Sequence, residues 1–75
     1  MMEYGTRIKQ KRRAAELRHD AVSRQVGLSV QSLLDIEKGR LPIDSVTYRR
    51  ILKGIREATA ERETLKARVD IQAAA

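Results

Sequence analysis

Basic side chains are the residues of this chain whose type and number point most directly to a chemistry. Sixteen Lys and Arg residues against ten Asp and Glu give a formal net charge of +6, and the isoelectric point is about 10.3. Lys and Arg neutralise phosphates and release their counterions, so this balance favours a polyanionic partner. The dense run from Arg7 to Arg13 is also what a solvated basic helix face looks like. Charge alone therefore suggests a nucleic acid without specifying one.

Catalytic and metal-binding chemistry finds little support in the residue types. The chain has no cysteine and a single histidine, His19, whereas a metal site draws several ligands from Cys, His and carboxylates. The carboxylates are scattered, and the sequence has no Gly-rich phosphate loop and no nucleophile with a neighbouring base. We therefore expect no enzyme activity, no metal and no cofactor.

The composition favours helices that would have to position these basic residues. A chain of 75 residues allows at most one compact core, and it is rich in Ala, Leu, Arg, Lys, Glu and Gln. No apolar run approaches the roughly 20 residues of a membrane span, and the N-terminus lacks the apolar core of a secretory signal. We expect an all-α protein of the cytoplasm, without association with membrane.

The apolar spacing predicts a first helix from Thr6 to Glu16, with Thr6 as its N-cap after Gly5. Its basic run then lies along one side of the helix. The apolar positions in and just after this segment are Ile8, Ala14, Ala15 and Leu17.

Two short helices joined by a tight turn are predicted next. Gly27 stands where the first of them needs a left-handed residue, and Ser29 can cap the second, which ends at Lys38 and Gly39. Ser23 is small enough to let the two helices approach closely. The positions expected to face a shared core are Val22, Val26, Leu28, Leu33 and Ile36.

A longer helix is predicted after Pro42, with Asp44 or Ser45 as its cap. Gly54 is tolerated inside it at a cost of about 1 kcal/mol, so the helix can continue through Leu65 toward Val69. The apolar positions that give its helical spacing are Tyr48, Ile51, Leu52 and Ile55.

The C-terminal part of this helix has few apolar residues, which sets it apart from the rest. We divide the chain into a domain of residues 1–56 and a helical extension of residues 57–75. The extension packs on the domain, pairs with the same helix of a second chain, or is partly disordered. Pairing is the alternative we favour, through Ile55, Leu65 and Val69.

The string from Leu17 to Gly39, LRHDAVSRQVGLSVQSLLDIEKG, resembles the Cro/repressor-type (XRE) helix-turn-helix regulators. With the flanking helices the resemblance covers about residues 6–56. It implies a compact bundle of four to five helices, with a helix-turn-helix and a C-terminal helical extension. It also implies a partly buried ion pair between Arg12 and Glu37.

Two positions depart from the family pattern. Glu16 stands where members usually have a glycine that ends the first helix, and Arg18 replaces the usual capping Ser or Thr. The corner between the first two helices is therefore expected to be built differently, with Asp20 as the cap.

In such a motif the second helix enters the major groove with its N-terminal residues toward the bases. Gln31 can bond adenine, although it is also an ordinary exposed polar residue. Asp35 can accept from cytosine, or it is excluded by phosphate repulsion or paired with a nearby Arg. The candidates for base contact are Val30, Gln31, Ser32 and Asp35. The candidates for phosphate contact are Arg18, His19, Arg24, Ser29 and Arg40.

These features predict a sequence-specific transcriptional regulator, a repressor, that binds double-stranded DNA at a palindromic operator as a homodimer. The alternative is an antitoxin-like or other protein-interaction module whose C-terminal helix binds a partner protein. A third alternative, non-specific basic binding, predicts steep salt dependence without sequence preference.

Overall fold

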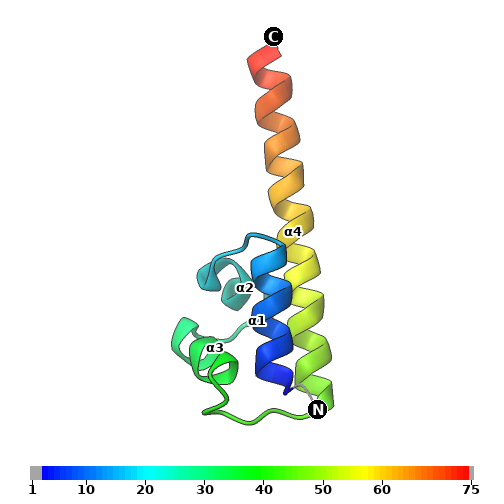
Figure 1. The fold of residues 1–75 in the computed structure, drawn as a ribbon. Coiled ribbons are helices and arrows are strands. Elements are labelled where there is room, and N and C mark those ends of the chain that lie inside the picture. The colour runs from blue at the N-terminus through cyan, green and yellow to red at the C-terminus, as the bar shows by residue number, and fades with distance from the viewer. Residues whose placement is uncertain (1–2, 75) are drawn as a thin grey trace.

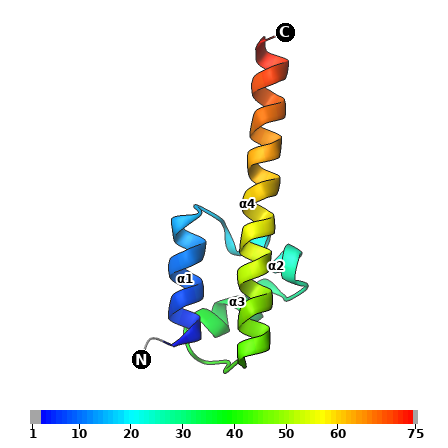
Figure 2. The same ribbon diagram turned by 90° about the vertical axis from the view of Figure 1, so that its right-hand side faces the viewer.

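The computed structural model describes the backbone of residues 3–74 and the side chains of residues 3–66. Within that range the secondary structure is entirely helical, with α1 (Tyr4–Ala14), α2 (His19–Val26), α3 (Val30–Glu37) and α4 (Ser45–Ala74). α1 and the first half of α4 run side by side, and α2 and α3 lie against one face of that pair (Figures 1 and 2). The predicted all-α bundle is confirmed, with four helices.

One aliphatic core holds the four helices together. Ile8 of α1, Val22 of α2, Leu33 of α3 and Ile51 of α4 are each fully buried, so every helix contributes a side chain to the centre. The other core residues are Leu17, Ile36, Ile55 and Ala58.

None of the helices in residues 3–74 combines the length and apolar character that a membrane span requires.

The first helix begins and ends two residues earlier than the sequence predicts. Thr6 was expected to be the N-cap, but Glu3 occupies that position without a side-chain cap bond. The ring of Tyr4 stacks on Tyr48 of α4, with centroids 4.4 Å apart and planes at 20°. This stack holds the first turn against α4, which explains why the helix already includes Tyr4.

The corner between α1 and α2 keeps the left-handed residue that the sequence departures put in question. Glu16 itself adopts it, with φ 57°, so the prediction of a different corner capped by Asp20 is wrong. Arg18 is the N-cap of α2 in extended conformation, without a side-chain cap bond. The buried Leu17 explains this start, because its carbonyl accepts a bond of 2.9 Å from Arg12 and so holds the chain just before α2.

The connection from α3 to α4 follows the prediction at both ends. Gly39 is left-handed, with φ 76°, and the amide of Arg40 donates to the Asp35 carbonyl at 2.8 Å. Asp44 accepts a bond of 2.7 Å from the Thr47 amide, which makes it the cap of α4. This bond lowers the pKa of Asp44.

α4 crosses the division proposed at residue 56 without a break. Ala58, beyond that division, is 5% exposed and belongs to the core. Beyond the other three helices, α4 continues as a single projecting helix (Figures 1 and 2). Whether residues 57–75 form a separate functional segment stays a prediction.

Candidate nucleic-acid interface

Two residues build the turn between α2 and α3: one ends α2 and the other caps α3. Gly27 adopts φ 81° at the end of α2, a conformation that costs glycine little because it has no Cβ. Its amide donates to the Ser23 carbonyl at 2.8 Å. Ser29 then accepts from the amide of Ser32 at 3.0 Å and so caps α3. These two residues fix the angle at which α3 leaves α2.

The N-terminal turn of α3 is the exposed part of that helix. Val30 is 40% exposed and Gln31 is exposed, whereas Leu33 and Ile36 are buried. Ser32 and Asp35 are half-buried, and Leu34 is also half-buried. The core therefore holds one side of α3 and leaves its first turn free to meet another molecule.

Gln31 and Asp35, both predicted to contact bases, contact each other. The side-chain amide of Gln31 donates to Oδ1 of Asp35 at 3.1 Å, one helical turn away. This bond directs one amide hydrogen of Gln31 along the helix and leaves its amide oxygen and second hydrogen available. In the protein without DNA, Asp35 therefore orients the side-chain amide of Gln31.

Three of the predicted phosphate contacts are exposed cations. Arg18 precedes α2, Arg24 lies in its last turn, and Arg40 follows α3. The other two are occupied within the fold. Ser29 uses its hydroxyl as the cap of α3 and donates to Ser32 Oγ at 2.9 Å. His19 places Nε2 3.2 Å from Glu37 Oε1.

A buried ion pair holds α3 against α1. Arg12 donates from Nε to Glu37 Oε2 at 2.8 Å and from a terminal nitrogen to Oε1 at 3.0 Å, with side chains 9% and 3% exposed. Burial alone would raise the pKa of Glu37. The hydrogen bonds and charges of Arg12 and His19 outweigh that effect, so the pKa lies below its ordinary value. Arg12 joins α1 to the end of α3 and is not available to DNA.

Sequence reasoning missed two glycines that allow helices to touch. A Cβ at Gly5 would overlap the Ile36 carbonyl oxygen of α3, and one at Gly54 would overlap Cγ2 of Val26 in α2. The sequence predicts only that Gly54 is tolerated inside a helix. Its position in the middle of an otherwise regular helix was the one available signal.

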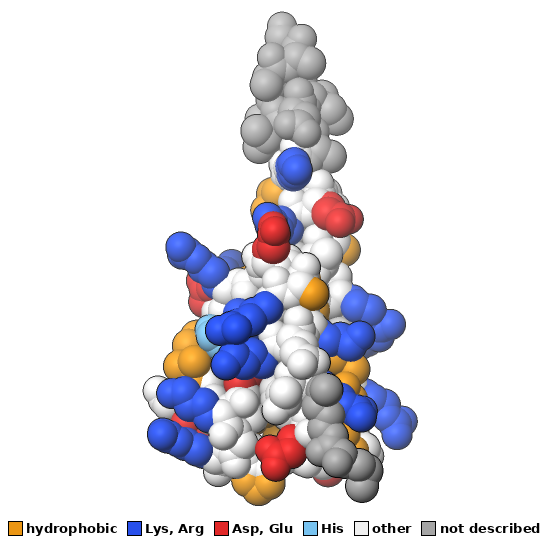
Figure 3. Space-filling view, in the orientation of Figure 1, with side chains coloured by type: hydrophobic (Ala, Val, Ile, Leu, Met, Phe, Trp, Pro, Cys, Tyr) orange, Lys and Arg blue, Asp and Glu red, His pale blue; other side chains and the backbone are white. Residues whose placement is uncertain are grey.

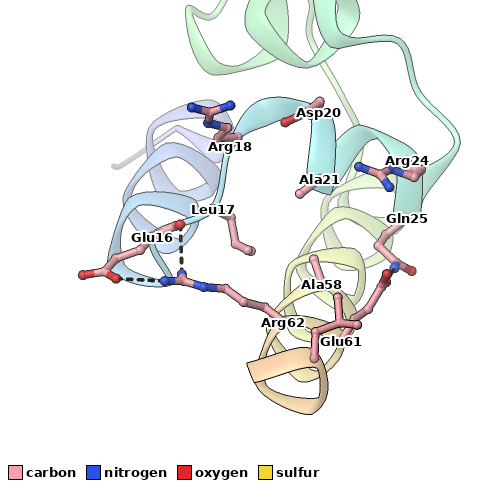
Figure 4. Close-up of a pocket in the computed structure, with 11 residues that line it drawn as sticks. Glu16, Leu17, Arg18, Asp20, Ala21, Arg24, Gln25, Ala58, Glu61 and Arg62 are labelled. Atoms are coloured by element: carbon pink, nitrogen blue, oxygen red, sulfur yellow. Dashed lines mark hydrogen bonds and ion pairs between the residues drawn. The ribbon is translucent and has the colours of Figure 1, made fainter. Parts of the chain in front are cut away.

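A groove of about 430 Å³ lies between α2, the corner before it and α4 (Figure 4). Leu17, Ala21 and Ala58 provide its apolar surface. Leu65, at one end of the groove, is 53% exposed. Of the predicted dimerisation residues, Ile55 is 5% exposed in the core, so we leave it out of any partner surface, and the side chain of Val69 lies outside the described residues.

Comparison with protein families gives one finding. A family model described as a helix-turn-helix domain matches residues 3–65, a range that includes the four-helix core and the first two thirds of α4. Searches of curated proteins and of solved structures gave no significant match. Helix-turn-helix domains are a class of DNA-binding domain, and the turn at Gly27 and the capped α3 have the geometry of that motif. The chain therefore belongs to the helix-turn-helix domain family.

Proposed function

We propose that this protein is a sequence-specific transcriptional regulator that reads DNA by placing the first turn of α3 in the major groove. The observation that carries the proposal is that Val30 and Gln31 are exposed on a helix whose opposite side is buried. A Gln side chain can form paired hydrogen bonds with adenine, and Val can contact the thymine methyl. The proposed function is DNA binding, without a catalytic reaction.

The surrounding cations support this docking pose. Arg18 and Arg24 precede α3 in the chain and Arg40 follows it, and all three side chains are exposed. Phosphate contacts from such positions orient a protein on the duplex and carry no sequence information. We therefore assign base readout to Val30 and Gln31 and phosphate contact to these three arginines.

We further propose that two copies bind a palindromic operator. A single motif presents few base-reading side chains, and specificity over a genome needs more. Leu65, exposed beside the groove, is an apolar side chain through which a second copy can pair. We propose that such a dimer acts as a repressor, by covering DNA that transcription requires, at the nucleoid in the cytoplasm.

Selection of bound sites from random duplex DNA tests the proposal. We expect a palindrome whose half-site centres lie about 10 base pairs apart, one turn of the duplex. An enriched single half-site would refute the dimer. Recovery of no preferred sequence, together with a steep loss of affinity in salt, would refute sequence-specific readout.

A further inference from the structure

The layer formed by α1 and residues 45–56 of α4 carries positive charge without any negative charge. Neither Tyr4–Ala14 nor residues 45–56 contains Asp or Glu. This layer faces the viewer in Figure 2, with α3 behind it, and Lys and Arg side chains project from the α4 side of the molecule in Figure 3. The cations of these two segments are Arg7, Lys9, Lys11, Arg12, Arg13, Arg49, Arg50, Lys53 and Arg56.

A depression of about 340 Å³ lies in this layer, between α1 and α4. Leu52, half-buried, is the apolar side chain that a partner can reach, whereas Ile55 also lines the depression but is only 5% exposed. Lys11, Arg49 and Arg56 are the exposed cations around it. Among the described residues, none of these three cations has a carboxylate oxygen within 4.0 Å, in contrast to Arg12, Lys53 and Arg62.

We propose that this depression binds an acidic helical segment of a partner protein, with an apolar side chain of that segment against Leu52. Three neighbouring cations without a carboxylate partner in the described part of the chain repel one another, and a bound carboxylate relieves that repulsion. Phosphate groups would use only the charges, whereas an acidic amphipathic helix uses the apolar surface as well. The observations therefore favour a protein segment over a second nucleic acid.

The position of the site separates it from the proposed DNA contact. Its lining comes from α1 and α4 alone, and the first turn of α3 lies in the other layer (Figures 1 and 2). A protein partner can therefore bind while α3 occupies DNA. The groove beside Leu65 is a poorer candidate, because its rim carries both signs of charge and Arg62 already bonds Glu16 there.

Fluorescence anisotropy with the full chain tests the proposal. The probe is a labelled helical peptide of Glu and Leu, with Leu spaced three and four residues apart, and a second peptide has Gln in place of Leu. We expect Arg49→Glu/Arg56→Glu to weaken binding of the Glu/Leu peptide by about tenfold or more. The matched control is Arg50→Glu/Lys53→Glu, which makes the same charge change on α4 beside the α2 residues Gln25 and Val26; it should retain most of the affinity.

Several results would overturn the proposal. If the two double variants lost equal affinity for the Glu/Leu peptide, only the net charge of the protein would matter for binding. Equal binding of the Gln peptide, or displacement of the Glu/Leu peptide by random duplex DNA, would indicate a general polyanion surface. A changed sedimentation coefficient for Arg49→Glu/Arg56→Glu would assign the face to contact between copies. If that variant does not fold, Arg49→Gln/Arg56→Gln must weaken peptide binding in the same direction. Operator binding is a separate readout that tests only α3.

Discussion

Arg12 is the residue that ties the folded core most directly to α3, the helix proposed to contact DNA. It donates to both oxygens of Glu37 and to the carbonyl of Leu17, so one guanidinium group joins α1, the α1–α2 corner and the end of α3. Removal of either member of such a pair leaves an unpaired buried charge, which typically costs about 3–5 kcal/mol. The pair is therefore a positioning device for α3 and not a DNA contact.

Glu37 should make the stability of the fold depend on acid. Its pKa is lowered in the folded state from an ordinary value of 4.5, so its stabilisation is present above that value and is lost as the pH falls through the folded-state pKa. We expect Glu37→Gln to lower the unfolding free energy at pH 7 by about 3 kcal/mol. The difference from the original protein should narrow below pH 4.5. Urea titrations across pH measure it, and a constant difference would contradict the prediction.

Gln31 should determine preference at one base pair, and Asp35 should act only through it. Gln31→Ala is expected to relax selectivity at a single position by about 1–3 kcal/mol. Asp35→Ala removes the 3.1 Å bond that orients Gln31, so it should relax the same position, less strongly. Competition assays with single-base operator variants measure both. Loss of preference at a different base pair in Asp35→Ala would show that Asp35 reads DNA itself.

The end of α1 is held by a residue from the far part of α4. Arg62 donates to the carbonyls of Ala15 and Glu16, both at 3.1 Å, and approaches the Glu16 carboxylate at 3.3 Å (Figure 4). These carbonyls follow the last turn of a helix, where intrahelical donors are missing. α4 thus stabilises the corner between α1 and α2, where Glu16 departs from the family pattern.

Glu16→Gly should be more stable than Glu16→Ala. Both variants lose the carboxylate that faces Arg62, but only alanine retains the strain of a side chain at φ 57°. Left-handed backbone costs a residue with a Cβ about 1–2 kcal/mol, part of which is offset by the greater freedom of glycine in the unfolded chain. We expect a net difference of about 1 kcal/mol in thermal or urea unfolding. Equal stabilities would mean that the corner relaxes at no cost.

Gly54 should resist replacement even though alanine is the better helix former. Alanine would gain about 1 kcal/mol in helix propensity, but its Cβ would overlap Cγ2 of Val26. We expect Gly54→Ala to be destabilising by about 1–3 kcal/mol because the contact of α2 with α4 must open. In a Val26→Ala background the same substitution should become neutral or stabilising. A double-mutant cycle that shows additive effects would refute this steric explanation.

At the scale of the whole molecule, the chain has three candidate surfaces for three proposed partners. The first turn of α3 serves the proposed DNA contact, the α1–α4 depression the proposed acidic segment, and the groove at Leu65 the proposed second copy. The last two lie on different sides of α4, since their linings share no residue. Arg18 and Arg24, assigned to phosphate contact, also line the groove at Leu65, so the DNA contact and the second copy meet at that edge. The α1–α4 depression shares no residue with either surface.

Leu65→Asp should separate dimerisation from folding. Leu65 is 53% exposed, so the substitution should leave the unfolding free energy of the isolated chain within about 0.5 kcal/mol. It should reduce dimer formation in sedimentation experiments and weaken binding to a palindrome more than to a half-site. Thr64→Asp, an exposed neighbour with the same charge change, is the control. Unchanged sedimentation of Leu65→Asp would remove Leu65 from the dimer surface.

Local sequence signals determined the helices and the turns between the second, third and fourth. Gly27, Ser29, Gly39 and Asp44 act on their own neighbourhoods, since caps and left-handed residues satisfy backbone groups a few positions away. The inward positions Val22, Leu33 and Ile36 followed from helical spacing for the same reason. The prospective base-reading turn of α3 could be located from the sequence because it lies directly after such a cap.

Only the tertiary structure decided the features that depend on residues far apart in the chain. The start of α1 is set by Tyr48, the left-handed Glu16 is bonded by Arg62, and Gly54 is required by Val26. Each partner lies more than thirty residues away or on another helix, so no local pattern announces it. The burial of Ile55 and the depression that Lys11 of α1 lines together with Arg56 of α4 arise in the same way, because side chains from different helices meet only after the chain has folded.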